Sequence, residues 1–356
     1  MKQQFFCLAV TLTITFLLFS NFVFAQTDIN NSILLPVCIN RKCGYINEKA
    51  EIVIKTQYAV AGNFSEGFAQ VRNDDTVYFF YIDTKGKLLA NSKQYRIADD
   101  FSEGLAAVQE NYGDKIGFIN TNGDYVIKPK FDSYIGKITG RFKEGLTYVY
   151  LDGKIGFINK QGDFVISPIF SGELTTNASE FSEDLAVVRL ATKYGYIDKT
   201  GKIKIFPKFD YASPFYEGLA GFSFDRQSFG FIDKSGKIVI QPIYDWVSKF
   251  SEGLAAVNIG MAWHGHQKSG GKYGFIEKTG KVVVEIKYDV VNPFSEGLAP
   301  VMVNRKWGFI DKTGKMIIEP KFDWAEQFKN GISKVTIGEK IGYIKKDGSY
   351  LWKPSQ

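Results

Sequence analysis

The chain has 356 residues, of which 45% are apolar and 15% are aromatic, and it carries 44 basic and 38 acidic side chains. The apolar content is enough to bury a large core. Lysines and acidic residues alternate along the chain instead of forming a basic stripe, which argues against a nucleic-acid-binding protein.

The first 25 residues have the pattern of a secretory signal peptide. Lys2 supplies a positive start, residues 5–24 are largely apolar, and Ala25 is the small residue expected before a cleavage site. We expect the mature protein to begin at Gln26, with a short segment up to residue 33, and to be periplasmic, displayed on the cell surface or secreted. The alternative is an uncleaved membrane anchor, because the apolar run approaches the length of a membrane span. We expect no membrane span after signal removal.

A unit of about 35 to 45 residues recurs nine times between Leu34 and the C-terminus, which is the length range of known repeat architectures. The clearest copy contains, in order, LAPV (298–301), WGFIDKTGK (307–315), PKFD (320–323) and Phe328. A motif repeated this often indicates architecture, whereas an enzyme needs an asymmetric set of residues placed once. We therefore predict one repeat domain over residues 34–356.

Each unit is predicted to contain a β-hairpin. The aromatic and β-branched run at residues 307–310 is typical of a strand. Its two sides are apolar apart from Gly308, so we expect both faces to be covered and a ring or backbone to approach the glycine closely. The turn DKTG at 311–314 closes the hairpin, because the Asp side chain can bond the backbone two residues on and the glycine can adopt a left-handed conformation. The second strand is expected to stop at Pro320, since proline cannot donate a ladder hydrogen bond.

An aromatic residue and an Asp then introduce the connection to the next unit. We expect residues 246–249, after Asp245, to form one helical turn capped by the Asp carboxylate. The turn FSEG at 250–253 leads into a third strand, LAAV at 254–257. Each unit is thus a three-stranded meander followed by a crossover. The glutamate of this turn recurs in most units, and because its copies share one environment we interpret it as structural rather than catalytic.

Both cysteines that remain after signal removal fall in the first unit. Alignment of residues 34–45 with 298–309 places Cys38 and Cys43 on either side of a tight connection between consecutive strands. A cross-strand disulfide is geometrically plausible there in an oxidising compartment, and we expect it to pin the first unit. A redox or metal pair is the weaker alternative, because no second pair completes a site.

The order and spacing of these phrases resemble the WG repeat family, named for the pair that is intact here at Trp307-Gly308. The resemblance is carried by KYGFI (272–276), FSEGLA (294–299) and KWGFI (306–310). It covers essentially the whole mature chain and implies a β-rich tandem array in a bacterial, often exported, protein. It implies no shared catalytic or binding residues. The second unit departs most from the pattern, with Phe80 in place of the glycine.

For the whole molecule we predict an all-β fold, in which nine three-stranded meanders stack as an open, twisted, solenoid-like array with the first and last units as caps. The competing architecture is a closed β-propeller. A propeller favours near-equal units of four strands, whereas only three strands have a clear signal in each unit and the unit lengths vary. This comparison favours the open array.

Insertions between the repeats are the candidate binding elements, because they can project without disturbing the stack. The longest, residues 258–272, contains Trp263 and both histidines of the chain, His264 and His266. We predict these three residues as partner-binding candidates. The two histidines could also ligate a metal, but a closed zinc site needs four ligands, so we expect no metal and no cofactor.

Two neighbouring units have extended loops at equivalent places, residues 133–141 and 171–180. One interpretation is a shared binding edge. The other is neutral loop growth, because lengthening a loop costs little free energy.

Three hypotheses for function follow. The first is a non-enzymatic protein that mediates protein–protein interaction or scaffolding at the cell envelope, with another envelope or extracellular protein as its partner. The second is a carbohydrate or cell-wall binding module that uses exposed rings such as Trp246, Trp263 or Trp324. The third and most remote is a hydrolase that uses paired carboxylates. Burial of the repeat aromatics would weaken the second hypothesis, and a lack of an acid pair in a cleft would weaken the third.

Overall fold

The structure is a computed structural model that describes residues 33–91, 93–133, 139–171, 178–264 and 267–354. These residues belong to one compact unit, Ile33–Gln356, and the predicted signal peptide lies outside them. Within the described ranges every helical or strand element is a β-strand. No helix in these ranges is long and apolar enough to cross a membrane.

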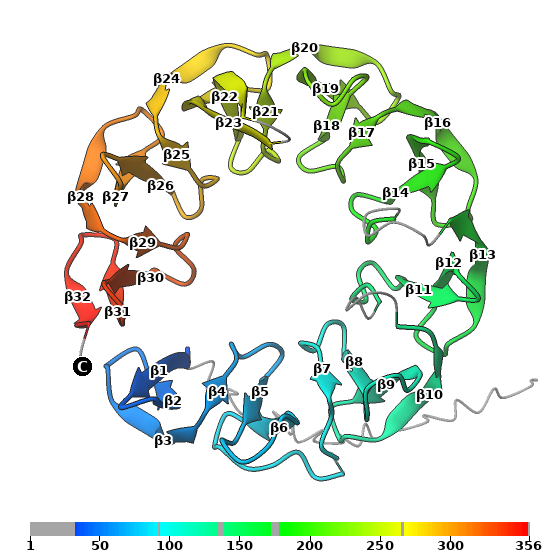
Figure 1. Ribbon diagram of the computed structural model, residues 1–356, viewed down its shortest axis with the longest axis vertical. Coiled ribbons are helices and arrows are strands. Elements are labelled where there is room, and N and C mark those ends of the chain that lie inside the picture. Colours follow the sequence, from blue (N-terminus) through cyan, green and yellow to red (C-terminus); the bar gives the residue numbers. More distant parts are fainter. Residues whose placement is uncertain (1–32, 92, 134–138, 172–177, 265–266, 355–356) are drawn as a thin grey trace, which may run out of the picture. The chain divides into compact units, whose positions relative to one another are not determined.

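The described strands form nine small antiparallel sheets. Numbered in chain order, they are sheet 1 (β1–β3), sheet 2 (β4–β6), sheet 3 (β7–β10), sheet 4 (β11–β13), sheet 5 (β14–β16), sheet 6 (β17–β20), sheet 7 (β21–β24), sheet 8 (β25–β28) and sheet 9 (β29–β32). The sheets follow one another around a ring, and the last lies beside the first (Figure 1). The all-β prediction is confirmed, but the open array is wrong, because the sheets close into a nine-bladed β-propeller.

Strands of four kinds recur from the centre of the ring to its rim (Figure 1). The inner strands have two residues each: β4 (Val60–Ala61), β7 (Ile97–Ala98), β17 (Tyr211–Ala212), β21 (Trp246–Val247), β25 (Val290–Val291) and β29 (Trp324–Ala325). The second strands are β1 (Leu35–Ile39), β5 (Phe68–Arg72), β8 (Leu105–Gln109), β11 (Thr147–Leu151), β14 (Leu185–Leu190), β18 (Leu219–Ser223), β22 (Leu254–His264), β26 (Leu298–Val303) and β30 (Ile332–Ile337). The third strands are β2 (Lys42–Ile46), β6 (Phe80–Asp83), β9 (Ile116–Asn120), β12 (Lys154–Ile158), β15 (Lys193–Asp198), β19 (Phe229–Asp233), β23 (Gln267–Glu277), β27 (Lys306–Asp311) and β31 (Lys340–Lys345). The outer strands are β3 (Ile52–Tyr58), β10 (Tyr125–Phe131), β13 (Phe164–Ser171), β16 (Ile203–Phe209), β20 (Ile238–Tyr244), β24 (Val282–Tyr288), β28 (Met316–Phe322) and β32 (Tyr350–Trp352).

The inner strand is the element that the sequence analysis missed. Residues 246–249 were predicted to form a helical turn, but Trp246 and Val247 pair with Asn258 and Val257 as β21 of sheet 7. The predicted crossover thus runs from the outer strand of one sheet to the inner strand of the next, and it supplies the fourth strand that a propeller requires.

The hairpin turns follow the predicted chemistry. In the DKTG turn, Asp311 Oδ1 accepts hydrogen bonds from the amides of Thr313 at 2.9 Å and Lys315 at 3.1 Å. Gly314 has a φ of 84°, in the left-handed region where glycine carries no steric penalty. The prediction for this turn is confirmed.

The strand that contains the Trp-Gly pair is covered on both faces, as predicted. Trp307, Phe309 and Ile310 are all buried. A Cβ atom on Gly308 would lie 2.4 Å from the carbonyl oxygen of Ile318, so the glycine admits the backbone of the outer strand.

Pro320 does not end the outer strand, contrary to the prediction. Strand β28 continues through it to Phe322. The pairing of β27 with β28 shifts register between Trp307 and Phe309, and the proline lies opposite this irregular stretch at the edge of the sheet. Its missing amide therefore costs no ladder hydrogen bond.

Adjacent sheets pack through aromatic rings. In sheets 1 to 8, the aromatic residue that follows the glycine position of the third strand contacts the phenylalanine that precedes the Ser-Glu-Gly turn, or its equivalent, of the next sheet. Ring centroids in such pairs lie 4.7 Å apart for Phe275 and Phe294 and 4.9 Å apart for Phe309 and Phe328, in tilted arrangements favourable for aromatic contacts. These contacts account for much of the high aromatic content.

The ring closes between sheets 9 and 1, which share no strand. Instead, Val37 and Ile46 of sheet 1 cluster with Ile332 and Tyr343 of sheet 9. The Tyr343 hydroxyl donates a hydrogen bond of 2.6 Å to the carbonyl oxygen of Pro36. Side-chain packing thus holds this seam, whereas the chain itself joins the sheets at every other junction.

Sheet 2 has no outer strand among its described residues. Here Phe80 occupies the position of the glycine, and the chain that follows pairs with the third strand only through isolated bridges, Ile82 with Leu88 and Phe79 with Tyr95. Because the outer strand packs its backbone against the glycine in the other sheets, a side chain at position 80 interrupts this pairing and leaves bridges only on either side of it. The departure noted in the second unit therefore has a structural consequence.

Candidate functional site

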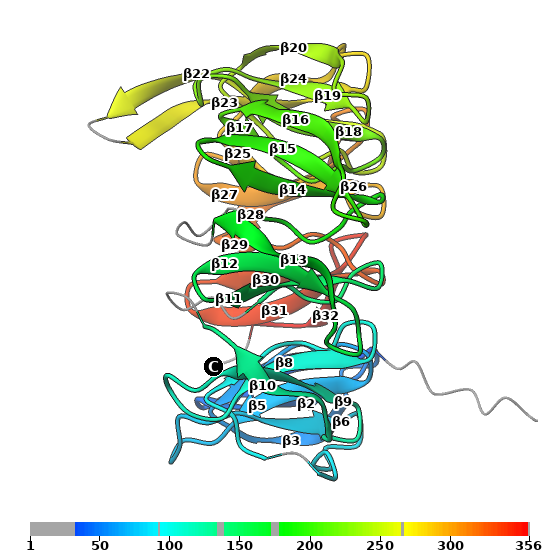
Figure 2. The ribbon, with the colours of Figure 1, turned by 90° about the vertical axis from the view of Figure 1, so that its right-hand side faces the viewer.

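The predicted partner-binding insertion is a long β-hairpin. Strands β22 and β23 pair from Leu254 and Glu277 out to Trp263, which faces Lys268, and His264, which faces Gln267. The hairpin projects beyond the other sheets (Figure 2). His266 lies outside the described residues. In the described ranges no group of three His, Cys, Asp or Glu side chains could hold a metal ion.

The base of this hairpin is held by Asp245. Its Oδ2 atom accepts hydrogen bonds from the amides of Gly260 at 2.6 Å and Met261 at 3.0 Å. Gly260 and Gly271 both have positive φ, and a Cβ atom on Gly271 would lie 2.3 Å from the side chain of Asn258. These glycines therefore permit a bulge at the point where the hairpin leaves the ring.

The same aspartate position holds a tight turn in other sheets. Asp289 accepts the amide of Asn304 at 3.0 Å, and Asp323 accepts the amide of Gly338 at 2.7 Å. The carboxylate that was predicted to cap a helical turn thus fixes the connection between the second and third strands.

Two tryptophans of the inner strands remain partly exposed. Trp246 is 37% exposed and packs edge-on against Tyr273 at the base of the long hairpin. Trp324 is 48% exposed and packs against Trp307. The aromatics that follow the glycine position are instead buried: Tyr45, Tyr81, Phe118, Phe157, Tyr196, Phe231, Phe275, Phe309 and Tyr343.

The two extended loops of sheets 4 and 5 approach each other where they return to the ring. The amide of Arg141 donates a hydrogen bond of 2.9 Å to Glu180 Oε1. The Arg141 guanidinium also binds Asp99 at 2.7 Å and Asp100 at 3.0 Å. Residues 134–138 and 172–177, the middle segments of the two loops in the sequence, lie outside the described residues.

Beside these loop ends is a pocket of about 210 Å³, which we call the inner pocket. The residues that line it come from three consecutive sheets, 4, 5 and 6. The residues that line it are Lys143, Tyr148, Ala178, Ser179, Glu180, Ser182, Pro214 and Tyr216. Sequence analysis placed the loops here but did not identify Lys143 or Tyr216.

Lys143 and Tyr216 could have been found from the repeat itself, because both replace the serine of the Ser-Glu-Gly turn. At this position Ser251 donates a hydrogen bond of 2.8 Å to the carbonyl oxygen of Phe294 in the next sheet. The same bond to the next sheet is made by Ser65, Ser102, Ser182 and Ser295. Sheets 4 and 6 exchange this structural residue for a long side chain.

The repeated glutamates form a clamp between neighbouring sheets. Glu252 Oε2 accepts the amide of Gly297 at 3.0 Å and lies 3.2 Å from the Lys312 ammonium, both in the next sheet. Equivalent amide and lysine contacts are made by Glu103, Glu144, Glu183, Glu217 and Glu296. Their carboxylates are therefore engaged in joining the sheets.

The clamp lowers the pKa of four of these carboxyls. Partial burial alone would raise the pKa of Glu252, but the Lys312 ammonium and the amides of Gly297 and Glu296 outweigh it. The net result is a pKa below the usual glutamate value. The pKa values of Glu103, Glu183 and Glu296 are lowered by contacts of the same kinds.

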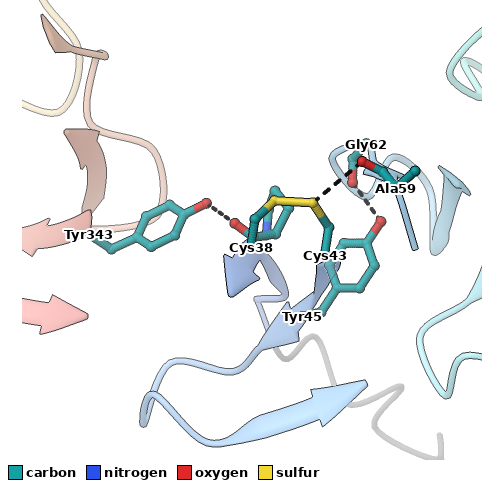
Figure 3. Close-up of a disulfide and its surroundings, with 7 residues drawn as sticks. Cys38, Cys43, Tyr45, Ala59, Gly62 and Tyr343 are labelled. Atoms are coloured by element: carbon teal, nitrogen blue, oxygen red, sulfur yellow. Dashed lines mark hydrogen bonds between the residues drawn. A yellow bond between two sulfur atoms is a disulfide. The ribbon is translucent and has the colours of Figure 1, made fainter. Parts of the chain in front are cut away.

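Cys38 and Cys43 face each other in the pairing of β1 with β2 and are joined by a disulfide. Figure 3 shows this bond close to the seam, with Tyr343 on one side and Tyr45 on the other. The Tyr45 hydroxyl donates a hydrogen bond of 2.8 Å to the carbonyl oxygen of Gly62 in sheet 2. The disulfide thus lies in a sheet that is joined to each of its neighbours by a tyrosine hydrogen bond, from Tyr343 of sheet 9 and from its own Tyr45 to sheet 2.

A second cleft, of about 560 Å³, opens between sheets 1 and 2. Tyr58, Phe80 and Leu88 line it together with the paired side chains of Lys42 and Asp74. It lies where sheet 2 lacks an outer strand, so we attribute the cleft to the replacement of glycine by Phe80.

The sequence matches the family described as WG containing repeat eight times. The matches span residues 44–76, 79–113, 116–154, 155–193, 194–225, 229–260, 273–307 and 307–340. The chain belongs to the WG containing repeat family. This confirms the resemblance inferred from its phrases. No curated protein matches this chain.

The WG repeats are offset from the sheets. The first match, residues 44–76, takes in the third and outer strands of sheet 1 and the inner and second strands of sheet 2. Each repeat therefore bridges two consecutive sheets, which gives those sheets a covalent connection.

Several solved structures align with this chain. A crystal structure of the eukaryotic initiation factor aligns with a TM-score of 0.60 at 11% identity, covering 90% of this chain and 95% of that one. Dihydro-heme d1 dehydrogenase NirN, in complex with DHE, gives a TM-score of 0.49 at 13% identity, covering 85% and 76%. AztD from Citrobacter koseri gives 0.42 at 12% identity, covering 91% and 95%. At these identities the similarity concerns the fold alone.

Proposed function

We propose that this WG protein is a non-enzymatic binding protein of the cell envelope or extracellular space, which scaffolds another protein through the β22–β23 hairpin. The observation that carries the proposal is the length of that hairpin. In sheet 8 the same pair of strands is joined by only two residues, Asn304 and Arg305, so the ring does not need the extension. A projecting element that the fold does not require is well placed for recognition.

Two further observations support the proposal. The repeated glutamates, the most numerous candidates for a catalytic carboxylate, are bound to backbone amides and lysines, which favours a structural use. The Cys38–Cys43 disulfide favours a location outside the cytoplasm, because disulfides persist in oxidising compartments.

The test is to replace residues 260–271 with Asn-Arg, the connection found in sheet 8, in the protein that begins at Gln26. Asp245 can then hold the new turn as Asp289 holds its own, so we expect an unchanged unfolding midpoint. Wild-type and shortened proteins are cross-linked to envelope fractions, and the products are identified by mass spectrometry. We expect a defined, saturable protein partner whose recovery falls at least tenfold with the shortened hairpin. Recovery of the same partner by both proteins would refute the assignment of the hairpin.

A carbohydrate-binding function is the second candidate, and the exposed faces of Trp246 and Trp324 favour it. The burial of the other repeat aromatics reduces its basis, because stacking on sugars requires exposed rings. The test is retention of the protein on cell-wall polysaccharide, with free sugar as competitor. This candidate would be established instead of the first if the double variant Trp246→Ala with Trp324→Ala lost the retention and the protein with the shortened hairpin kept it.

A further inference from the structure

The inner pocket contains two departures from the repeat that meet in space. Lys143 in sheet 4 and Tyr216 in sheet 6 both replace the serine that elsewhere bonds the next sheet. The Lys143 ammonium lies 5.5 Å from the centre of the Tyr216 ring, and the Lys249 ammonium lies 4.6 Å from the same ring. One aromatic ring thus contacts two cations from different sheets.

These two lysines differ from the lysines that join neighbouring sheets. Lys199 and Lys312, for example, bind glutamates of the neighbouring sheets. By contrast, neither Lys143 nor Lys249 forms an ion pair with a carboxylate in the described ranges. Their ammonium groups lie within about 10 Å of each other, close to one Debye length at 0.1 M salt, so their potentials add at the ring between them.

The remaining polar groups of the pocket are mostly engaged with the protein. Ser182 Oγ donates a hydrogen bond to the carbonyl oxygen of Phe215, and Ser179 Oγ donates to the carbonyl oxygen of Glu180. Glu180 is the acidic residue of the lining, and it accepts the amide of Arg141, whose guanidinium lies against two aspartates. Burial raises the pKa of the Tyr148 hydroxyl, and Tyr150, Glu180 and Asp99 raise it further.

We propose that the inner pocket binds an anionic group, a carboxylate or a tetrahedral oxyanion, through the Lys143 ammonium beside the Tyr216 ring, while the Lys249 ammonium, which contacts the same ring from outside the lining, adds to the positive potential. An anion there would neutralise the two adjacent cations, which the protein leaves without a described counter-charge. The site is independent of the β22–β23 hairpin, since none of its residues belongs to that element.

The test uses inorganic phosphate, sulfate and acetate as probes at low ionic strength, with titration calorimetry and chemical shifts as readouts. We expect saturable binding of at least one probe to the protein that begins at Gln26. Tetrahedral anions and acetate are titrated separately, which distinguishes an oxyanion from a carboxylate site. The failure of all three probes to bind would overturn the proposal.

The repeat supplies a conservative variant and a matched control. Lys143→Ser restores the residue found at this position in five other sheets, so the protein is expected to keep its unfolding midpoint while anion affinity falls at least tenfold. Tyr216→Ser is expected to act in the same direction. Lys329→Ser removes a lysine from the equivalent position of sheet 9 and should leave affinity unchanged. Equal affinity in wild type and Lys143→Ser, or an equal loss in Lys329→Ser, would contradict the assignment.

Discussion

Glu252 shows how an acidic residue can recur in a repeat without a catalytic role. Its φ of 55° and the φ of 85° at Gly253 make a tight turn, and a non-glycine residue in the left-handed region costs roughly 1–2 kcal/mol. The conformation directs the carboxylate across the junction to Gly297 and Lys312. The interaction with the next sheet offsets the local cost.

Replacement of Glu252 by alanine is expected to lower stability at neutral pH by about 1–2 kcal/mol, since it leaves the Gly297 amide without its charged acceptor. Denaturant unfolding measures the change. Glu319→Ala, which alters an exposed glutamate of the outer strand, is the control and should have almost no effect. A similar loss in both variants would show that the clamp adds nothing.

The same junction predicts the direction of the pH dependence. The pKa of Glu252 is lowered in the folded protein, so its contribution is fully present above the unfolded pKa, about 4.3, and is lost as the pH falls through the lower folded value. Wild type and Glu252→Ala should therefore converge in stability at acidic pH.

At this scale, the sequence was sufficient to identify repeated residues but not the contacts between the exceptional ones. Asp311 and Gly314 follow local rules of turn chemistry, and both were predicted correctly. Lys143 and Tyr216 can be recognised in the sequence as replacements of the repeated serine, but their contact across sheet 5 depends on how three consecutive sheets pack and could not be predicted from it.

The outer strand depends on the absence of a side chain at the glycine of the third strand. At Gly308 a Cβ atom would collide with the backbone of Ile318, and the equivalent Gly230 is limited in the same way by Ile240. Sheet 2 is a natural contrast, because Phe80 at this position coincides with an outer segment that pairs only through isolated bridges. The glycine thus permits a continuous outer strand.

Gly308→Ala is accordingly expected to destabilise the protein by about 1–3 kcal/mol, the usual cost of forcing an extra group into a packed site. Its effect should be concentrated in β27 and β28, as measured by hydrogen exchange. Ile317→Ala, at an exposed position of the same outer strand, serves as the control. An unchanged exchange rate in β28 would show that the backbone contact is not needed.

Elements of ordinary length were predictable, whereas the shortest ones were not. The third strands, including Trp307 and Phe309, combine aromatic and β-branched residues bounded by turns. An inner strand such as Trp246–Val247 has only two residues, well below the typical strand length of 5–6, and carries no periodic signal. Its β conformation comes from pairing with β22, which sequence reasoning did not consider.

This one omission also led to the wrong architecture for the whole molecule. Without a fourth strand, the units suggested an open stack, and variable unit length reinforced that interpretation. In the structure the extra length lies in the β22–β23 hairpin and in the loops near Arg141 and Glu180, outside the packed sheets. Differences in unit length therefore do not imply that the packed sheets differ in size.

The seam between sheets 9 and 1 can be tested with a pair of matched variants. Tyr343→Phe removes the bond to Pro36, and Tyr196→Phe removes the same kind of bond, to Ser213, at a junction that the chain crosses. Each loss costs about 1 kcal/mol, or roughly fivefold in a local opening equilibrium. We expect Tyr343→Phe to speed hydrogen exchange in β1 and β31, and Tyr196→Phe to leave its junction protected. Equal protection in both would mean that the seam is no weaker than the other junctions.

The offset between repeats and sheets has a consequence for how such rings change over evolutionary time. An in-frame duplication or deletion of one repeat transfers half of one blade and half of the next, so the flanking blades are always restored complete. Only the curvature of the ring has to adjust. The non-covalent seam can absorb that adjustment, because its two sides are free to meet at a slightly different angle. Blade number is therefore a property that unequal recombination can alter in a single step.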